Sequence, residues 1–148
     1  MNPNPLVHFK LLQTPDRVEG IARMLLQRNR LQPSVLILCP DDGFAAQLND
    51  RLWTIHPTSF LAHDIATQEQ AHNAMQPILL STSICWDNAP EVLINGTLEV
   101  PPALDKFKHI VDFVDGWDER LKQAARDRFR TYRQMSLDPQ YFGNEKAS

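Results

Sequence analysis

Short apolar runs alternate with segments of helical periodicity in the first third of the chain. Residues 6–12 are mostly apolar and predict a strand, and residues 34–39 form a continuous apolar run, typical of a strand covered on both faces. Between these runs, apolar residues recur at helical spacing to about Asn29, and Thr14 is expected to cap this helix. Asp41 is expected to cap a second helix. The order strand, helix, strand, helix predicts a layered α/β domain with right-handed crossovers.

The remaining two thirds of the chain contain three more strand candidates and one long helix. The polar stretch 67–76 gives no clear prediction, whereas residues 117–135 return to helical periodicity. No such pattern continues beyond that helix, so we expect a single α/β domain over residues 1–136 and a flexible C-terminal tail over residues 137–148. The strand candidates are residues 77–81, 92–95 and 109–114.

The composition is that of one soluble globular domain. The chain has 148 residues, of which 43% are hydrophobic and 22% charged, and this excludes an intrinsically disordered polypeptide. A formal net charge of -3 argues against a protein that coats nucleic acid through bulk positive charge. No apolar stretch approaches the roughly 18 residues that a membrane helix needs, and the N-terminus lacks the pattern of a signal peptide. Cys39 and Cys85 lie within or beside apolar runs and are expected to be buried, reduced thiols, which favours a cytoplasmic location.

Signatures of catalysis are missing from the sequence. Neither of the two glycine-rich phosphate-binding loops occurs, and the acidic residues Asp41 and Asp42 at a helix start oppose a bound phosphate. The five histidines show no metal-ligand spacing. His63 and Asp64 are neighbours in an extended segment and are expected to point to opposite faces. No nucleophile elbow is present. We therefore expect no catalytic residue, no metal and no cofactor.

The C-terminal helix carries an excess of positive charge. Six basic and three acidic residues between Asp118 and Arg133 give this segment a net charge of +3. At 100° per residue, an apolar stripe predicted to pack on the sheet lies next to a cationic face, and Phe129 falls at the seam between them. The apolar stripe consists of Leu121, Ala125 and Tyr132. The cationic face consists of Lys122, Arg126 and Arg133, which fall within about 40° of one another, with Arg130 at its flank.

A cationic face with an aromatic residue at its edge suits a short acidic peptide that also supplies an apolar anchor. Arginine can hold a carboxylate through two parallel hydrogen bonds, and an aromatic ring can form the wall of a pocket. The alternative is an ordinary solvated helix, because acidic residues early and basic residues late in a helix also follow its dipole. The residues alone leave both interpretations open.

A second informative segment has two large aromatic residues on either side of a turn. Trp53 is expected at the end of the second helix, one residue after the core-facing Leu52, and Phe60 follows Pro57 in a loop. These two side chains could form an exposed docking patch, or they could close the end of the core. The pattern favours neither.

Together, the two segments resemble the chi subunit family of bacterial DNA polymerase III holoenzyme. The first part of the resemblance is Leu52-Trp53…Pro57-x-Ser59-Phe60-x-x-His63. The second part is Val111-Asp112-Phe113-Val114…Leu121-Lys122-Gln123-x-Ala125-Arg126-x-Arg128…Tyr132-Arg133. Chain length, the strand and helix at the start and the C-terminal basic helix also fit, so the resemblance covers nearly the whole chain.

The resemblance implies a non-catalytic adaptor with a three-layer α/β/α fold, Rossmann-like but without a nucleotide-binding loop. In this family one surface binds the acidic C-terminal tail of single-stranded-DNA-binding protein, so contact with nucleic acid is mainly indirect. The residues carried over to that surface are Val114, Lys122, Arg126, Phe129 and Arg130. The family often has Tyr where this chain has Phe129, a change that removes one hydroxyl and keeps the aromatic wall.

A second surface of the family binds the psi subunit, which tethers chi to the clamp loader. Trp53 and Phe60 match the family's residues at that surface, which is also thought to serve a repair helicase. The implied location is the bacterial cytoplasm, with the replication machinery at the nucleoid.

Two other functions are compatible with parts of the sequence. A degenerate nucleotide-binding α/β enzyme would share the alternation of strands and helices, and a sizeable thermal stabilisation by ATP, NAD or GTP would favour it. Direct binding of single-stranded DNA through the basic helix is the other possibility. The net negative charge and the lack of a recognisable stacking platform on that helix argue against it.

Overall fold

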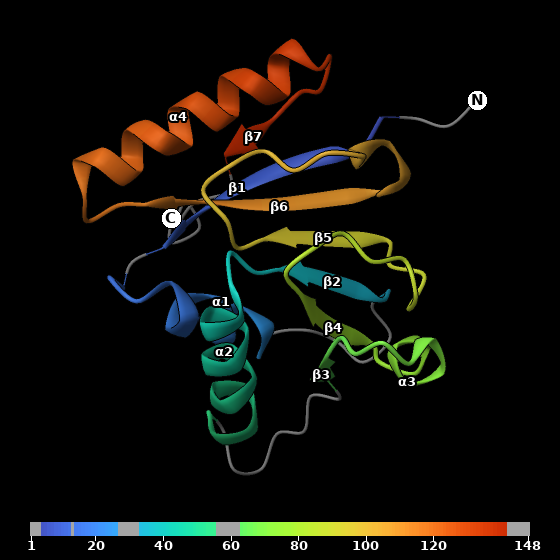
Figure 1. The fold of residues 1–148 in the computed structure, drawn as a ribbon. Coiled ribbons are helices and arrows are strands. Elements are labelled where there is room, and N and C mark those ends of the chain that lie inside the picture. Colours follow the sequence, from blue (N-terminus) through green and yellow to red (C-terminus); the bar gives the residue numbers. More distant parts are fainter. Residues whose placement is uncertain (1–3, 13, 27–32, 56–62, 142–148) are drawn as a thin grey trace.

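A parallel β-sheet is the centre of the computed structural model, which describes residues 4–12, 14–26, 33–55 and 63–141. In these ranges seven strands form one sheet in the order β3-β4-β2-β5-β6-β1-β7, and every neighbouring pair is parallel (Figure 1). The strands are β1 (Leu6–Leu12), β2 (Val35–Leu38), β3 (His63–Ile65), β4 (Ile78–Ser81), β5 (Val92–Asn95), β6 (His109–Asp115) and β7 (Gln140–Tyr141).

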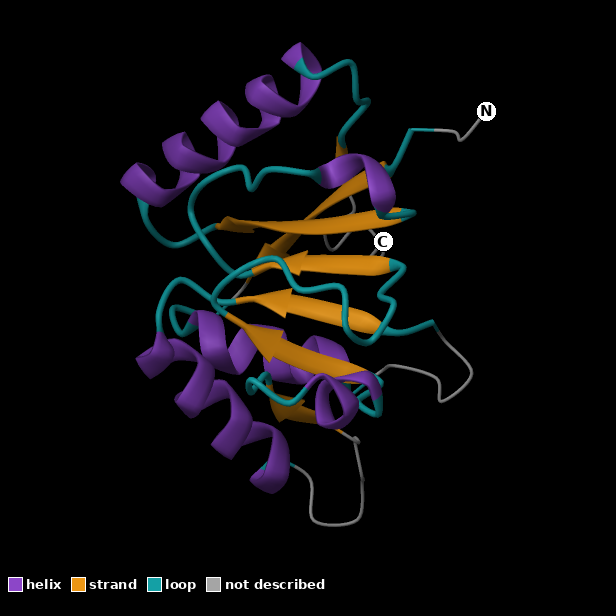
Figure 2. Cartoon of the chain, turned by 45° about the vertical axis from the view of Figure 1, so that its right-hand side comes forward, coloured by secondary structure: helices purple, strands orange, loops and turns teal. Residues whose placement is uncertain are grey.

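Helices cover both faces of this sheet, as Figure 2 shows, and the predicted three-layer α/β/α fold is confirmed. α1 (Arg17–Leu25) and α2 (Asp42–Thr54) bury their apolar stripes on one face. α4 (Glu119–Gln134) packs on the other face, together with a short 3-10 helix (Leu104–Lys106). The central strands are buried on both sides, because successive residues of an extended strand point to opposite faces and both faces carry helices.

The two N-terminal helices begin at aspartates. The Asp41 carboxylate accepts a hydrogen bond from the Phe44 N–H at 2.7 Å, so the predicted cap of α2 is confirmed. The predicted cap of α1 is wrong by two residues, because Asp16 rather than Thr14 accepts from the Glu19 N–H. A carboxylate satisfies the free amide and also favours the positive end of the helix dipole. α1 ends at Leu25, and the predicted end near residue 29 lies outside the described residues.

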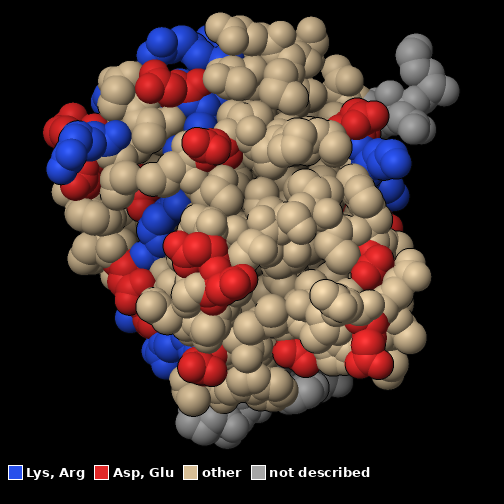
Figure 3. Space-filling model, in the orientation of Figure 1, with Lys and Arg blue, Asp and Glu red and all other residues tan. Residues whose placement is uncertain are grey.

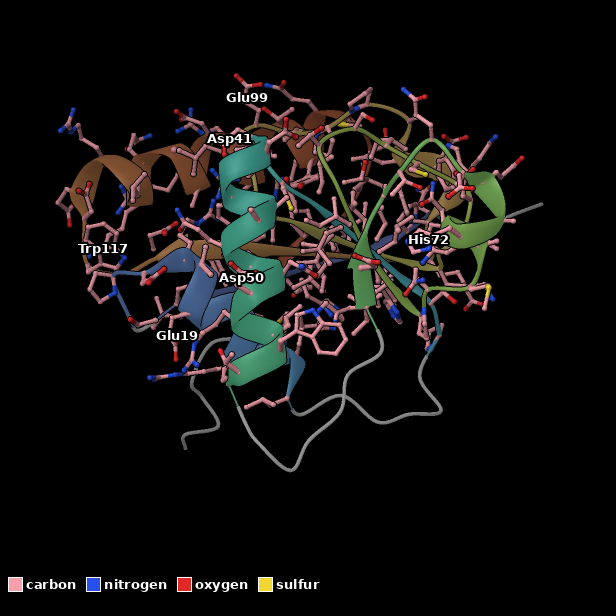
Figure 4. The ribbon with its side chains drawn as sticks, turned by 60° about the horizontal axis from the view of Figure 1, so that its bottom comes forward. Glu19, Asp41, Asp50, His72, Glu99 and Trp117 are labelled. Atoms are coloured by element: carbon pink, nitrogen blue, oxygen red, sulfur yellow. The ribbon has the colours of Figure 1, made fainter. Side chains whose placement is uncertain are left out.

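Glu19 of α1 (labelled in Figure 4) forms an ion pair with Arg51 of α2 and so connects the two helices. Its carboxylate accepts hydrogen bonds from Arg51 of α2, including one from Nη2 at 3.0 Å, and from Arg23 one turn along α1 at 2.8 Å. These hydrogen bonds lower the pKa of Glu19 to about 2, with the bonds from Arg51 as the main cause. The pair keeps the two helices side by side on the sheet.

The polar stretch 67–76, which gives no clear prediction, contains the five-residue helix α3 (Gln70–Ala74), and the short strand β3 at the sheet edge comes just before it. Asn73 holds this segment together. Its amide accepts from the Thr67 N–H at 2.9 Å and donates to the Thr67 carbonyl and to Asp87, both at 2.8 Å. As expected, Asp64 does not pair with its neighbour His63; it lies 3.1 Å from His72 on α3 instead. These elements are too short for a hydrophobic period to reveal them.

The first residues of the predicted tail belong to the folded structure. The sequence predicts a flexible tail over residues 137–148, yet Gln140–Tyr141 form β7 and pair with His8 and Phe9 of β1. Leu137 packs against the core on the α4 side, and Pro139 is buried. The folded domain therefore extends through Tyr141, and residues 142–148 lie outside the described residues.

The two cysteines differ in their surroundings. Cys39 is buried, as predicted, and burial raises the pKa of its thiol to about 12. Cys85 is only partly buried, although burial still raises its thiol pKa. Both are free thiols that remain protonated at neutral pH. Within the described ranges, no helix is both long and apolar enough to cross a membrane.

Candidate functional site

Asp118 caps the start of α4: its carboxylate accepts hydrogen bonds from the N–H groups of Arg120 and Leu121 at 2.8 and 3.1 Å. The helix turns Ala125 and Tyr132 fully into the core, and Leu121 is half-buried, so the predicted apolar stripe is confirmed. The opposite flank faces solvent. This orientation decides which of the basic side chains a partner can reach.

Arg128 belongs to the core and not to the basic surface. The net charge of +3 counted from the sequence therefore overstates the positive charge that a partner can reach. The Arg128 side chain is 3% exposed, and its Nε donates to both carboxylate oxygens of Asp112 on β6, at 3.1 and 3.2 Å. Its Nη2 donates to the carbonyl of Phe113 at 2.8 Å. Without this neutralised pair, the segment from Asp118 to Arg133 carries five basic and three acidic residues, a net of +2.

Two more buried groups complete this network beneath α4. The Tyr132 hydroxyl donates to Asp112 at 2.7 Å, and the Asn95 amide donates to the same carboxylate oxygen at 3.2 Å. Burial, together with the Asp112 carboxylate, raises the pKa of Tyr132 well above its ordinary value, so the hydroxyl keeps the proton that it donates. The hydrogen bonds fix the rotation of α4 on the sheet and thereby the direction of its solvent-facing side.

Figure 3 shows positive side chains gathered over α4, interspersed with acidic ones. Arg126 and Arg130 are exposed, and Lys122 is about one-third exposed. Each has a partner within the helix: Lys122 pairs with Glu119 at 3.1 Å, Arg130 pairs with Asp127 at 3.2 Å, and Arg126 donates to the Gln123 side chain at 3.2 Å. Surface pairs of this kind are worth at most about 1 kcal/mol, so a ligand carboxylate can replace them.

Phe129 lies at the seam, as predicted, and three neighbours cover its ring. The ring centroid is 5.3 Å from that of Phe9 on β1 and 5.0 Å from that of Tyr141 on β7. The Arg133 guanidinium carbon lies 5.0 Å from the same centroid. The Phe129 side chain is therefore half-buried, and it joins the helix to the sheet as well as bordering the basic surface.

The floor beside the basic surface is apolar. Val114 on β6 is half-buried on the α4 side of the sheet and lies in register with Leu11 of β1, whose side chain is 37% exposed. Val114, Lys122, Arg126, Phe129 and Arg130 thus come from one strand and one helix that pack together. This arrangement offers cationic groups next to apolar surface, which is what an acidic peptide with an apolar anchor needs.

Tyr141 is a residue of this region that sequence reasoning missed. Its ring lies nearly parallel to that of Phe129, with an interplanar angle of 12°, and its side chain is 55% exposed. A strand of two residues is too short to show the alternation of apolar and polar positions, so both residues fall within the tail predicted from the sequence. The aromatic pair Tyr141-Phe142, soon after Pro139, is a signal in the sequence that could have marked this segment as more than a flexible tail.

The second predicted surface is described in part. Trp53 lies at the end of α2 with its side chain 52% exposed, and its ring packs on that of His63, 4.4 Å away between centroids. Trp53 is therefore largely exposed rather than enclosed in the core, and its part in a docking patch stays a prediction. Phe60 lies outside the described residues.

A buried ion pair lies where the carboxyl end of β6 meets the start of α1. Arg17 Nε is 3.1 Å from the Asp115 carboxylate, and Arg17 Nη1 donates to the Gly96 carbonyl at 2.7 Å. Burial raises the pKa of Asp115 and lowers that of Arg17. Open α/β sheets usually bind nucleotides at the carboxyl ends of their strands. At this strand end, the Asp115 carboxylate of β6 is already paired with Arg17 at the start of α1. Among the described residues, no group of three or more His, Cys, Asp or Glu side chains is placed to hold a metal ion.

Comparison with known proteins gives the family of the chain. The model of the family described as DNA polymerase III chi subunit, HolC, matches residues 5–140. The chain belongs to the chi subunit family. Curated relatives include the DNA polymerase III subunit chi of Pseudomonas aeruginosa, 29% identical over 87% of this chain and 89% of the relative. The subunit chi of Escherichia coli is 28% identical over 84% of this chain and 88% of the relative.

Solved structures show that the chi fold is shared with distant proteins. The C-terminal domain of S. cerevisiae Dbp5, solved with Gle1 and IP6, matches with a TM-score of 0.60 at 10% identity, over 94% of this chain and 90% of that chain. The crystal structure of T4 UvsW matches with a TM-score of 0.59 at 7% identity, over 94% of this chain and 41% of that chain. At such identities the likeness concerns the fold alone.

Proposed function

We propose that this chain is a non-catalytic adaptor of the DNA polymerase III holoenzyme. It links the clamp loader, through the psi subunit, to the acidic C-terminal tail of single-stranded-DNA-binding protein during DNA replication in the bacterial cytoplasm. The observation that carries the proposal is the basic, solvent-facing side of α4 with Phe129 at its edge, on a chain of the chi family. Contact with DNA itself is mainly indirect.

The tail site combines charge with apolar contact. Lys122, Arg126 and Arg130 can exchange their weak pairs within the helix for carboxylates of the tail. Val114 and Phe129 supply the apolar surface for the anchor side chain. Since the site attracts its ligand largely by charge at an exposed surface, added salt weakens the contact.

The psi site lies at the other edge of the molecule. Trp53 is next to β3, the first strand in the sheet order, whereas the tail site borders β7, the last one (Figure 1). Six spacings between neighbouring strands separate these edges by about 29 Å. Two weak contacts in series hold the polymerase near coated DNA, because a coated strand displays many tails and raises their effective concentration. In this proposal the psi surface also serves as the binding surface for a repair helicase.

Replacing Arg126 with Ala is expected to weaken binding of an acidic peptide ending in Phe by about tenfold, because one charge-assisted hydrogen bond is lost at an exposed position. Isothermal titration calorimetry with the synthetic peptide measures the change. Arg120→Ala is the matched control, since Arg120 is also exposed but lies on the far side of α4 from Lys122. Equal losses in the two variants would show unspecific charge attraction, and unchanged binding by Arg126→Ala would place the site elsewhere.

Phe129→Ala is expected to abolish measurable peptide binding and to lower the melting temperature, because the ring contacts Phe9 and Tyr141 as well as the ligand site. Phe129→Tyr keeps the ring and should bind as well as the wild type or slightly better. Calorimetry and a thermal melt of both variants provide the measurement. A Phe129→Ala protein that melts lower but binds the peptide normally would assign Phe129 to the core only.

A further inference from the structure

The exposed ring of the aromatic cluster on the α4 side is Tyr141 and not Phe129. Phe9 is fully buried, and Phe129 is enclosed by Phe9, Tyr141 and Arg133. Tyr141 packs in parallel on Phe129 and tilts against Phe9, with centroids 5.8 Å apart, and still leaves 55% of its side chain to solvent. A ligand side chain that approaches this cluster meets the Tyr141 ring first.

We propose that Tyr141 is a specificity-determining residue of the tail site, and that its ring selects acidic peptides with an aromatic anchor side chain. This inference rests on the proposed function, because it concerns the ligand of the same surface. β7 fixes the position of the ring: Tyr141 pairs with Phe9 of β1, and Phe9 in turn packs on Phe129 and Tyr132 of α4. The two sides of the site, helix and sheet edge, are joined through these rings.

The geometry favours an aromatic anchor over an aliphatic one. Ring pairs gain about twofold to tenfold in affinity beyond the area that they bury, and Tyr141 offers a ring that is already held in place by its stack on Phe129. The cationic groups are adjacent, since Arg133 lies over Phe129 and Arg126 and Arg130 are exposed on the same helix. A peptide with carboxylates close to an aromatic residue therefore matches both the charge and the apolar part of the surface.

A nucleobase could also stack on an exposed ring beside cations, and the ring supplies the platform that the sequence did not reveal. The charges favour the peptide. Outside the buried Arg128–Asp112 pair, the segment from Asp118 to Arg133 carries a net charge of only +2, and the whole chain carries -3. The experiment therefore has to distinguish binding of a single-stranded oligonucleotide from binding of the peptide.

The experiment measures two peptides on the full chain by calorimetry: one acidic peptide ending in Phe and the same peptide ending in Ala. For the wild type we expect tighter binding of the Phe peptide. In Tyr141→Ala this preference should fall by about tenfold, with the affinity for the Ala peptide changed less than twofold. Gln140→Ala is the matched control, because Gln140 is the other residue of β7, is also exposed and points to the opposite face.

Tyr141→Leu is the second variant, in case truncation to Ala releases β7 from β1. Leucine keeps apolar volume on Phe9 and lacks a ring, so it should keep the melting temperature and lose the preference for Phe. Tyr141→Phe should keep both. A preference that stays unchanged in Tyr141→Ala and Tyr141→Leu overturns the inference while leaving the tail site standing, whereas a wild type that binds neither peptide overturns the proposed function itself. An oligo(dT) that binds the wild type and loses affinity in both variants, with the peptides unaffected, would assign Tyr141 to nucleic acid and also overturn the inference.

Discussion

Replacing Asp112 with Ala is expected to lower the free energy of unfolding by about 3–5 kcal/mol, the usual cost of removing one partner of a buried ion pair. Asp112 is fully buried and accepts hydrogen bonds from Arg128, Tyr132 and Asn95. Its loss leaves the Arg128 guanidinium in the core between β6 and α4 without its hydrogen-bonded carboxylate. Equilibrium unfolding in urea, followed by circular dichroism, measures the change.

Two comparisons make this prediction specific to the network. Tyr132→Phe removes only the hydroxyl donor and should cost about 1–2 kcal/mol. Asp127→Ala removes a carboxylate that is exposed and paired with Arg130 at the surface of α4, and it should change the stability by about 0.5 kcal/mol or less. If Asp112→Ala costs no more than Asp127→Ala, the buried pair contributes nothing to the attachment of α4.

Trp53→Ala is expected to weaken binding of the psi subunit by at least about 2 kcal/mol, roughly thirtyfold, because large aromatic anchors dominate such interfaces. The affinity for the acidic peptide should stay within about threefold, since Trp53 lies beside β3 and the proposed tail site borders β7, at opposite edges of the sheet. Surface plasmon resonance with immobilised psi, beside calorimetry with the peptide, measures both affinities.

Gln47→Ala is the control for the psi surface, because Gln47 is exposed on the same helix nearly two turns before Trp53. It should leave both affinities unchanged. A thermal melt accompanies each variant. If Trp53→Ala loses psi and the peptide together and melts at a much lower temperature, Trp53 acts through the packing of α2 and the model of two separate surfaces fails.

The fold was predictable where long apolar runs and helical periods dominate. The strands at residues 6–12 and 34–39 and the amphipathic C-terminal helix follow directly from burial, which the period of apolar residues records. β3 and β7 were not predictable, because two or three residues at a sheet edge show no period. Their place in the sheet depends on tertiary contacts, such as the packing of Tyr141 on Phe9.

The candidate site was predictable in part, for a related reason. The helical wheel places Lys122, Arg126 and Phe129 correctly, because it depends only on the geometry of one helix. The same wheel places Arg128 within the apolar stripe, about 20° from Leu121, but it does not give the partner of this buried cation, because the Asp112 carboxylate lies on another element. An aspartate inside an apolar strand requires a buried donor, and this rule could have pointed to an arginine or tyrosine of the covering helix.

The place of β1 in the sheet has a consequence for the order of events during synthesis. β1 is made first, yet its two neighbours are β6 and β7, so that Leu6 pairs with His109 and Phe9 with Tyr141. Contacts between residues so far apart in the chain close large loops and form slowly. While the ribosome adds the intervening hundred or so residues, the first strand has no partner in the sheet and exposes apolar side chains. The nascent chain is therefore expected to depend on chaperones, and a ribosome that stops before β6 would release an aggregation-prone fragment rather than a smaller domain.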